Sequence, residues 1–117
     1  MDKQLSPITL GDLLLWLLRR RRRFRVTGRS MEPLLQPGDE ILIAPRAYWR
    51  SPPSISDIVI ARRPDRLDLR VIKRVTDVSA DGACFLTGDN LQASTDSRTF
   101  GWVTPEHILG RVTCRFF

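Results

Sequence analysis

The stretch Gly28–Asp39 (GRSMEPLLQPGD) constrains the fold of this chain more than any other, because glycine and proline frame it. Two prolines within twelve residues exclude a continuous helix, and the residues around Ser30 do not alternate as a strand requires. Pro37 and Gly38 fit the central pair of a type II turn, in which glycine takes the positive φ. We therefore expect a shaped loop that holds Ser30, either as a nucleophile or within an ordinary surface turn.

The charge of the chain is concentrated in one short segment. The 117 residues carry a formal net charge of +6, and the six arginines between positions 19 and 25 equal the whole excess. Residues 26–117 hold twelve basic and eleven acidic side chains, so this part is nearly neutral. A nucleic-acid-binding face spreads basic residues over a domain and interleaves aromatic ones. The length indicates one domain, and the charge pattern argues against a nucleic-acid partner.

Metal and disulfide chemistry have little support in the sequence. Cys84 and Cys114 lie thirty positions apart in apolar runs, and His107 is the only histidine. No spacing resembles a set of metal ligands, so we expect no metal site and no cofactor. A disulfide between the two cysteines stays an alternative, but two buried reduced cysteines are the favoured interpretation. His107 falls in a short helical turn, where a partly exposed residue is favoured over a catalytic base.

An apolar segment, Ile8–Leu18, begins with Thr9 and Asp12 at the spacing of a helix-capping box. It holds eleven residues, whereas a membrane-spanning helix needs about 20, so we expect a helix that does not cross a bilayer. No cleavable export signal is evident, because the arginines follow the apolar residues. Two interpretations stay open: the helix packs on its own domain, or Leu13–Arg25 contacts a membrane surface. We expect a cytoplasmic protein, peripheral at the inner face of the membrane in the second case.

From residue 24 onward, short apolar and β-branched runs separated by turn signals indicate strands. The expected strands are Phe24–Val26, Glu40–Ala44, Asp57–Ala61, Leu69–Val78, Ala83–Thr87 and Gly110–Phe117. Asp81 and Gly82 fit a hairpin turn, and Gly88–Gly101 is a long polar loop of the kind that compact domains keep for function. The sequence therefore predicts a mainly antiparallel β domain over residues 24–117, preceded by a helical, basic extension over residues 1–23.

Lys73 is one of only two lysines in the chain and lies inside an expected strand. By strand alternation Val71, Lys73 and Val75 share one face. Burial between valines lowers the pKa of a lysine by about 3–5 units, into the range of a working general base. The alternative is a lysine on an edge strand that discourages aggregation, and periodicity does not decide between them.

Three segments together resemble the type I signal peptidases. Ser30–Leu35 with Gly38-Asp39 is similar to the family's S-M-x-P-[TI]-L-x-x-G-D box, and Arg70–Val75 is similar to its lysine-containing box. Gly88–Gly101 is similar to the third box, G-D-N-x-x-x-S-x-D-S-R-x-x-G. The boxes occur in order and cover residues 24–112. The resemblance implies the small antiparallel signal-peptidase-like β fold, which self-cleaving repressors of the SOS type share.

The resemblance also implies a catalytic dyad. Ser30 is the expected nucleophile, and Lys73, as a neutral amine, is its expected general base. Ser94 corresponds to a serine that hydrogen-bonds the lysine ammonium, and the backbone N–H of Ser30 corresponds to one oxyanion donor. Gly28 stands where some relatives carry a serine hydroxyl as a further donor. The dyad implies a serine endopeptidase.

Other motif residues are expected to shape the site. Met31 and Pro33 are expected to line the substrate cleft. Asp96 and Arg98 match a structural ion pair. The remaining residues carried over from the three boxes are Gly38, Asp39, Arg74, Gly88, Asp89, Asn90 and Ser97.

The parts that the resemblance lacks suggest a branch of the family. Only fourteen residues separate Lys73 from Gly88, so we expect neither the large second β domain of bacterial preprotein signal peptidases nor their transmembrane anchor. In this the chain is similar to the small maturation proteases of nickel-type superoxide dismutase. That implies a protein substrate with an N-terminal propeptide, and nickel that belongs to the substrate. A leader peptidase at the membrane surface, a self-cleaving SOS-type regulator and an inactive membrane-surface module are the alternatives.

Overall fold

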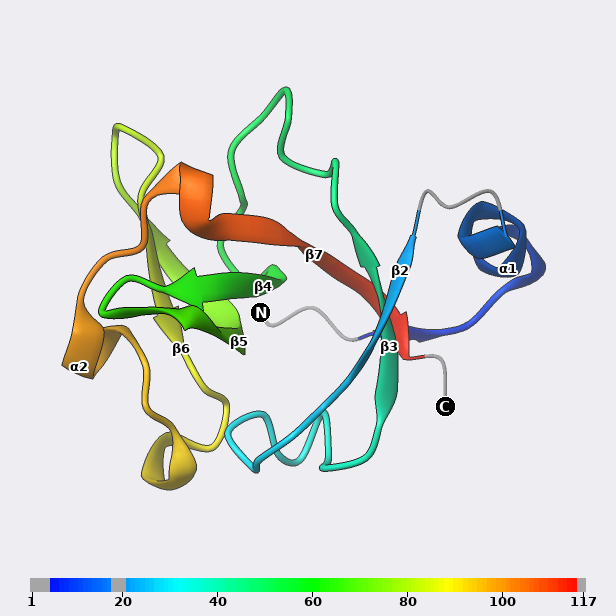
Figure 1. The fold of residues 1–117 in the computed structure, drawn as a ribbon, viewed down its shortest axis with the longest axis horizontal. Helices are drawn as coiled ribbons and strands as arrows, with labels where there is room; N and C mark the ends of the chain where they lie inside the picture. The colour runs from blue at the N-terminus through cyan, green and yellow to red at the C-terminus, as the bar shows by residue number, and fades with distance from the viewer. Residues whose placement is uncertain (1–4, 18–20, 116–117) are drawn as a thin grey trace.

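The computed structural model describes residues 5–17 and 21–115. Its centre is one β-sheet with the strand order β2-β3-β7-β4-β5-β6, and β1 pairs with β7 in parallel outside that path (Figure 1). The strands are β1 (Ser6–Pro7), β2 (Arg22–Arg25), β3 (Glu40–Ala44), β4 (Ile58–Arg63), β5 (Arg66–Val78), β6 (Cys84–Thr87) and β7 (Ile108–Arg115). The helical elements are α1 (Leu10–Leu17), η1 (Leu91–Ala93), α2 (Ser97–Phe100) and η2 (Pro105–His107).

The mainly antiparallel β fold expected from the sequence is confirmed, with shifted strand boundaries. The strand expected at Phe24–Val26 is β2, which begins two residues earlier and ends one residue earlier. β4 runs to Arg63, past its expected end, because Pro64 occupies the hairpin turn, where its missing N–H interrupts no ladder. β1 was not expected, since two residues cannot show alternation. The last two residues of the expected closing strand lie outside the described residues.

β4 is buried on both faces and contributes to two apolar clusters. Ile58 and Ile60 enter one cluster and Val59 and Ala61 enter the other, since successive side chains of a strand point to opposite faces. The first cluster comprises Val26, Met31, Leu35, Ile41, Ile43, Ile58, Ile60 and Val112. The second comprises Val59, Ala61, Val75, Cys84, Leu86 and Val103. The neighbouring strand β5 therefore places alternate residues against two apolar environments.

Helix α1 begins with the expected capping box. The amide of Asp12 donates to Thr9 Oγ1, and the amide of Thr9 donates to Asp12 Oδ2, both at 3.1 Å. The final residue of the expected helix, Leu18, lies outside the described residues. β1 pairs with β7, and the boundary expected between residues 23 and 24 falls inside β2.

One face of α1 packs on the sheet and the other is exposed. Leu13 and Trp16 pack against the small buried cluster around Leu42 of β3. Leu10 and Leu14 are 83% and 57% exposed. Among the described residues, no helix is both long and apolar enough to pass through a membrane. The packing of the helix on its own domain is observed, and a membrane contact through residues 13–25 stays a prediction.

Gly110 lies where β7 meets the end of β3 with no room for a side chain. A Cβ there would lie 2.7 Å from the carbonyl oxygen of Ala44 and 3.0 Å from Pro45 Cα, and backbone cannot give way cheaply. We predict that Gly110→Ala lowers the free energy of unfolding, measured in urea, by about 1–3 kcal/mol. Gly11→Ala in α1 is the control, since its nearest contact would be 3.7 Å, and it should be neutral or stabilising. Equal midpoints for the two variants would contradict this packing.

Candidate active site

The loop Gly28–Asp39 is closed by backbone hydrogen bonds at its base. The amide of Val26 donates to the Asp39 carbonyl at 2.8 Å, and the amide of Gly38 donates to the Val26 carbonyl at 2.9 Å. Gly38 has a φ of 91°, as expected for the third position of a type II turn. Gly28 has a φ of 75°, a conformation that disfavours a residue with a side chain. The loop is therefore a shaped element rather than a mobile connection.

Buried residues and the third box hold Ser30 in place. Met31 and Leu35 are 1% and 0% exposed, so the loop is anchored in the core directly after Ser30. From the other side, the amide of Asn90 donates to the Ser30 carbonyl at 2.8 Å, and Asn90 Nδ2 donates to the Arg29 carbonyl at 3.1 Å. The carbonyls of Arg29 and Ser30, on either side of the Ser30 Cα, are thus both bound by one residue sixty positions away.

Gly88 permits the close approach of the two loops. A Cβ at Gly88 would lie 2.6 Å from the Ser30 carbonyl oxygen and 2.3 Å from Ser94 Oγ. Any side chain there would push the Ser30 loop away from the rest of the site. The glycine of the third box is therefore explained by sterics at the nucleophile's backbone.

Arg74 ties the same loop to β5. Its Nε and Nη2 donate to the two carboxylate oxygens of Asp89 at 2.8 and 2.9 Å, and its Nη1 donates to the Ser56 carbonyl at 2.9 Å. The side chains of Arg74 and Asp89 are only 6% and 18% exposed. A two-pronged, largely buried pair fixes both distance and orientation. It sets the third box against the strand that carries Lys73.

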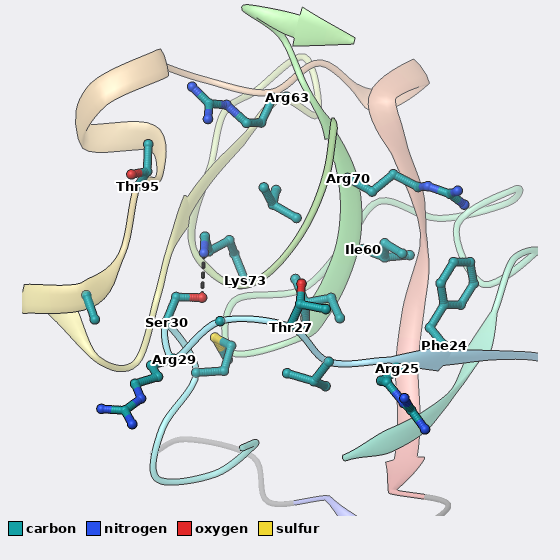
Figure 2. A pocket seen from close by; sticks show the side chains of 16 residues that line it. Phe24, Arg25, Thr27, Arg29, Ser30, Ile60, Arg63, Arg70, Lys73 and Thr95 are labelled. Atoms are coloured by element: carbon teal, nitrogen blue, oxygen red, sulfur yellow. Dashed lines mark hydrogen bonds between the residues drawn. The ribbon is translucent and has the colours of Figure 1, made fainter. Parts of the chain in front are cut away.

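Lys73 Nζ lies 2.6 Å from Ser30 Oγ (Figure 2). Lys73 pairs with Val59 of β4 in the strand register, and the residue is 5% exposed. Its burial excludes the alternative of an exposed edge-strand lysine. A lysine and a serine 43 positions apart in sequence are thus in direct hydrogen-bond contact.

The pKa of Lys73 is lowered to about 8, chiefly because burial disfavours the charged form. The negative charge of Asp96 opposes this shift, and the positive charge of Arg63 adds to it. At slightly alkaline pH a large fraction of the amine is neutral and can accept a proton. The geometry and the pKa together suit a general base.

Asp96 organises the remainder of the third box. It accepts hydrogen bonds from Ser94 Oγ at 2.6 Å, from the Gly88 amide at 3.0 Å and from Arg98 Nε at 2.9 Å. Burial alone would raise the pKa of Asp96, but the bonds from Arg98, Ser94 and Gly88 outweigh it and hold the pKa well below its ordinary value. The expected Asp96–Arg98 ion pair is present. Ser94 donates its hydroxyl hydrogen to Asp96, and its expected contact with the Lys73 ammonium stays a prediction.

Helix α2 connects this cluster to β6. The amide of Leu86 donates to Ser97 Oγ at 2.8 Å, and both atoms are buried. Gly101, at a φ of 81°, ends the helix with its amide bonded to the Ser97 carbonyl. Ser97 therefore has a structural position away from the Ser30–Lys73 contact.

The Ser30–Lys73 pair opens into a pocket of about 310 Å³ (Figure 2). Its walls are the segment leading from β2 into the Ser30 loop, the middle of β5, and η1 with the residues after it. Met31 lines the pocket as expected. Pro33 does not, because the chain turns back on itself after Met31 and leaves Pro33 exposed on the outside. The expected place of Pro33 in the substrate cleft stays a prediction.

The chain also matches a known protein family over most of its length. Two overlapping segments, residues 8–82 and 76–117, match the family described as signal peptidase, peptidase S26. The chain belongs to this family. The match spans the Ser30 loop, Lys73 and the third box, so the three boxes resembling those of signal peptidases lie inside it.

Individual relatives carry the names of membrane proteases and of a signal peptidase. The chain is 36% identical over 110 residues to mitochondrial ATP-independent inner membrane protease subunit 1b of Arabidopsis thaliana, and 31% identical over 108 residues to mitochondrial inner membrane protease subunit 1 of Xenopus tropicalis. These alignments cover 75% and 76% of this chain, and the chain spans only 65% of the length of each relative.

A third relative covers nearly all of this chain. A probable signal peptidase I of Synechocystis sp. is 25% identical over 162 aligned positions, which cover 98% of this chain and 82% of the relative. The alignment is longer than the 117 residues here, so that relative contains residues with no counterpart in this S26 chain. None of these matches singles out the nickel-type superoxide dismutase branch, which remains a prediction.

The two cysteines and the histidine lie apart from the Ser30–Lys73 contact. Cys84 and Cys114 are free and buried, which confirms the reduced state expected for them. His107 lies in η2, where its Nδ1 is 3.3 Å from Thr104 Oγ1, and it does not line the Ser30 pocket. Within residues 5–17 and 21–115, no group of His, Cys, Asp and Glu side chains is placed to hold a metal ion.

Two parts of the site were missed by sequence reasoning. Arg74 and Asp89 were expected as motif residues, but not as partners of one another, because nothing in a single sequence indicates a contact between two segments. Arg63 and Arg70 line the pocket and carried no signal beyond their charge. Whether these two arginines reach the pocket depends on which strand edges border it, and the sequence does not show that.

Asp89→Asn tests the clamp between the third box and β5. Removing the charge leaves the buried Arg74 without its two-pronged partner, so we predict a loss of about 3 kcal/mol in the free energy of unfolding. Asp68→Asn is the matched control, because Asp68 is 3.7 Å from Arg66 at an exposed position, and it should change stability by less than about 0.5 kcal/mol. Urea denaturation followed by tryptophan fluorescence measures both. A neutral Asp89→Asn would contradict the clamp.

Proposed function

We propose that the chain is a serine endopeptidase that removes an N-terminal leader or propeptide from a partner protein, with Ser30 as nucleophile and Lys73 as general base. The observation that carries the proposal is the 2.6 Å contact between Lys73 Nζ and Ser30 Oγ at a pocket open to solvent. Membership of the S26 signal peptidase family supports the same chemistry.

The two side chains account for each proton in an acyl-transfer reaction. The neutral Lys73 amine takes the proton of Ser30 as Oγ attacks the carbonyl carbon of the scissile bond. The resulting ammonium gives that proton to the leaving amine when the carbon–nitrogen bond breaks, which leaves an ester on Ser30. A water molecule then attacks the ester with the amine again as base, and the acid is released with the serine restored.

The Ser30 backbone N–H supports the oxyanion in this mechanism. Among the described residues the Ser30 amide donates to no acceptor, so it is available to a developing negative charge. Gly28 offers no side-chain hydroxyl at the position where some relatives of the family carry one. Its positive φ is the physical reason that glycine suits this place. A further donor would come from backbone or water.

Two unpaired strand edges suit an extended peptide substrate. β2 is at the end of the strand order, and β5 pairs with β6 only from Arg74 onward, so its earlier residues have β4 on one side alone. The end of β2 and residues Arg70–Lys73 of β5 both line the pocket. A substrate strand bound between them would gain main-chain hydrogen bonds and would pass Ser30.

The identity of the substrate is the finer part of the proposal. Relatives are named as mitochondrial inner membrane proteases and as a signal peptidase, which supports a leader peptidase acting near a membrane. The exposed Leu10 and Leu14 of α1 offer apolar surface for contact with the inner face of a membrane. The precursor of nickel-type superoxide dismutase is the specific substrate that we propose to test first. Its propeptide is the kind of N-terminal extension that such an enzyme would remove.

Replacing either member of the dyad should abolish cleavage without unfolding the chain. We predict that Ser30→Ala and Lys73→Met each reduce the rate of processing by at least about 10³-fold. Lys73→Met should keep or raise the melting temperature, because it removes a poorly hydrated amine from the interior. The assay mixes the protein with precursor proteins, including that of nickel-type superoxide dismutase, and reads new N-termini by mass spectrometry.

Ser51→Ala, at an exposed loop position outside the site, is the control and should process normally. A Ser30→Ala protein that still cleaves the substrate would contradict the proposal. Loss of mass from the chain itself without added substrate would favour the self-cleaving regulator instead.

The pH dependence should report Lys73. Its pKa is lowered to about 8, and only the neutral amine acts as base, so kcat/KM should rise about tenfold per pH unit below 8 and level off above it. The positive charge of Arg63 contributes to that lowering, so Arg63→Gln should move the profile to higher pH. Initial rates between pH 6 and 10 measure both. A midpoint near 6.5 that is unaffected by Lys73 substitution would point to a histidine and contradict the assignment.

A further inference from the structure

We propose that the pocket selects substrates with an acidic side chain three or four residues from the scissile bond, and that Arg70 is the residue that contacts it. This inference rests on the proposed function and names a property of the substrate that the dyad alone does not supply. It is carried by the charge of the pocket, by the surroundings of Arg70 and by the spacing along β5.

The pocket is cationic without compensation from its own walls. Arg25, Arg29, Arg63, Arg70 and Lys73 line it, and none of its sixteen lining residues is Asp or Glu (Figure 2). A concave site lined by one sign of charge concentrates ligands of the opposite sign. The preferred occupant is therefore a peptide with negative charge near the cut.

Arg70 is an exposed strand arginine of this pocket, whereas Arg63 is engaged by a carboxylate. Arg63 is bound to Asp65 through two hydrogen bonds at 2.7 and 2.9 Å, so its charge is partly balanced. Among the described residues no carboxylate pairs with Arg70, and Asp68, two positions away on β5, contacts Arg66 at 3.7 Å. Arg70 is exposed and available to an anion.

The surroundings of Arg70 hold its side chain at the pocket and make its charge unfavourable while no anion is bound there. Its guanidinium carbon lies 5.3 Å from the centre of the Phe24 ring of β2. In the strand register Arg70 stands directly opposite Arg62 of β4. Like charges facing each other across two strands are destabilising. A bound carboxylate would relieve this repulsion.

The spacing along β5 sets the position of the acidic residue. Arg70 precedes Lys73 by three residues, which at a strand rise of about 3.3–3.4 Å places it about 10 Å away along the edge. A substrate strand paired with that edge advances at the same rate. Because three is an odd number of residues, Arg70 lies on the face of β5 opposite to that of Lys73, and a substrate residue paired with Arg70 presents its side chain on that same face. Val71 and Ile72, one on each face, also line the pocket and favour apolar substrate side chains next to the cut. The expected pattern is apolar residues beside the scissile bond and an acidic one beyond them.

A peptide library read by mass spectrometry tests this inference. Wild type and Ser30→Ala are incubated with an equimolar library of synthetic 14-residue peptides, and Ser30-dependent cuts are aligned at the scissile bond. We expect Asp and Glu to be enriched at the third or fourth position on one side of the cut. Individual peptides with Asp at that position should have a kcat/KM about two- to fivefold above their Ala counterparts, less so at high salt. Arg70→Glu should lose this preference and favour Lys or Arg there.

Arg50→Glu is the matched control. Arg50 is exposed and does not line the Ser30 pocket, so its substitution changes the net charge by the same amount and should leave the acidic preference intact. Equal rates for Asp and Ala peptides with wild type would overturn the inference while leaving the endopeptidase in place. So would an acidic preference that survives in Arg70→Glu, or one that Arg50→Glu abolishes equally. The absence of any Ser30-dependent cut would overturn the proposed function itself, and this inference with it.

Discussion

The hydrogen-bond contact between Lys73 and Ser30 is the interaction on which the rest of this structure depends. It joins residues 43 positions apart, so neither local structure nor chain proximity brings them together. One partner comes from the interior of a long strand and the other from a loop. The loop reaches the strand because Asn90 binds the carbonyls of Arg29 and Ser30, and because Gly88 has no side chain that would collide with the Ser30 carbonyl. The third box is thus a clamp for the nucleophile.

Burying a lysine is unfavourable, and the structure limits this cost without removing it. Lys73 is 5% exposed, and Asp96 supplies an opposing charge nearby. Asp96 itself is satisfied by Ser94, Gly88 and Arg98, so it stays anionic without bonding the lysine directly. A direct ion pair would hold Lys73 in its charged form and remove it as a base. Because the carboxylate does not bond the amine, the pKa of Lys73 stays lowered to about 8, and the amine can lose its proton at slightly alkaline pH.

The sequence predicted the architecture well where its signals are local. Alternation marked most of the strands, and the glycine at position 38 marked its turn through the positive φ that it adopts. It gave less where an outcome depends on a partner. The bond from the Ser94 hydroxyl to the buried carboxylate of Asp96 was not expected. Pro33 was expected in the substrate cleft and does not line the Ser30 pocket. β1 was overlooked because its two residues gain their strand character only by pairing with β7.

By itself, the sequence determined the mainly β fold and was sufficient to predict a chemistry, because a serine loop framed by glycine and proline, a lysine within a strand and a polar third box can be recognised from the order of residue types. Only the tertiary structure decided that Lys73 is buried, since burial of a strand face depends on what covers it. Only the structure, likewise, set Arg74 against Asp89 and gathered arginines from β2, β4 and β5 around one pocket. Charge and geometry between distant segments arise when the chain closes its sheet, and no local pattern encodes them.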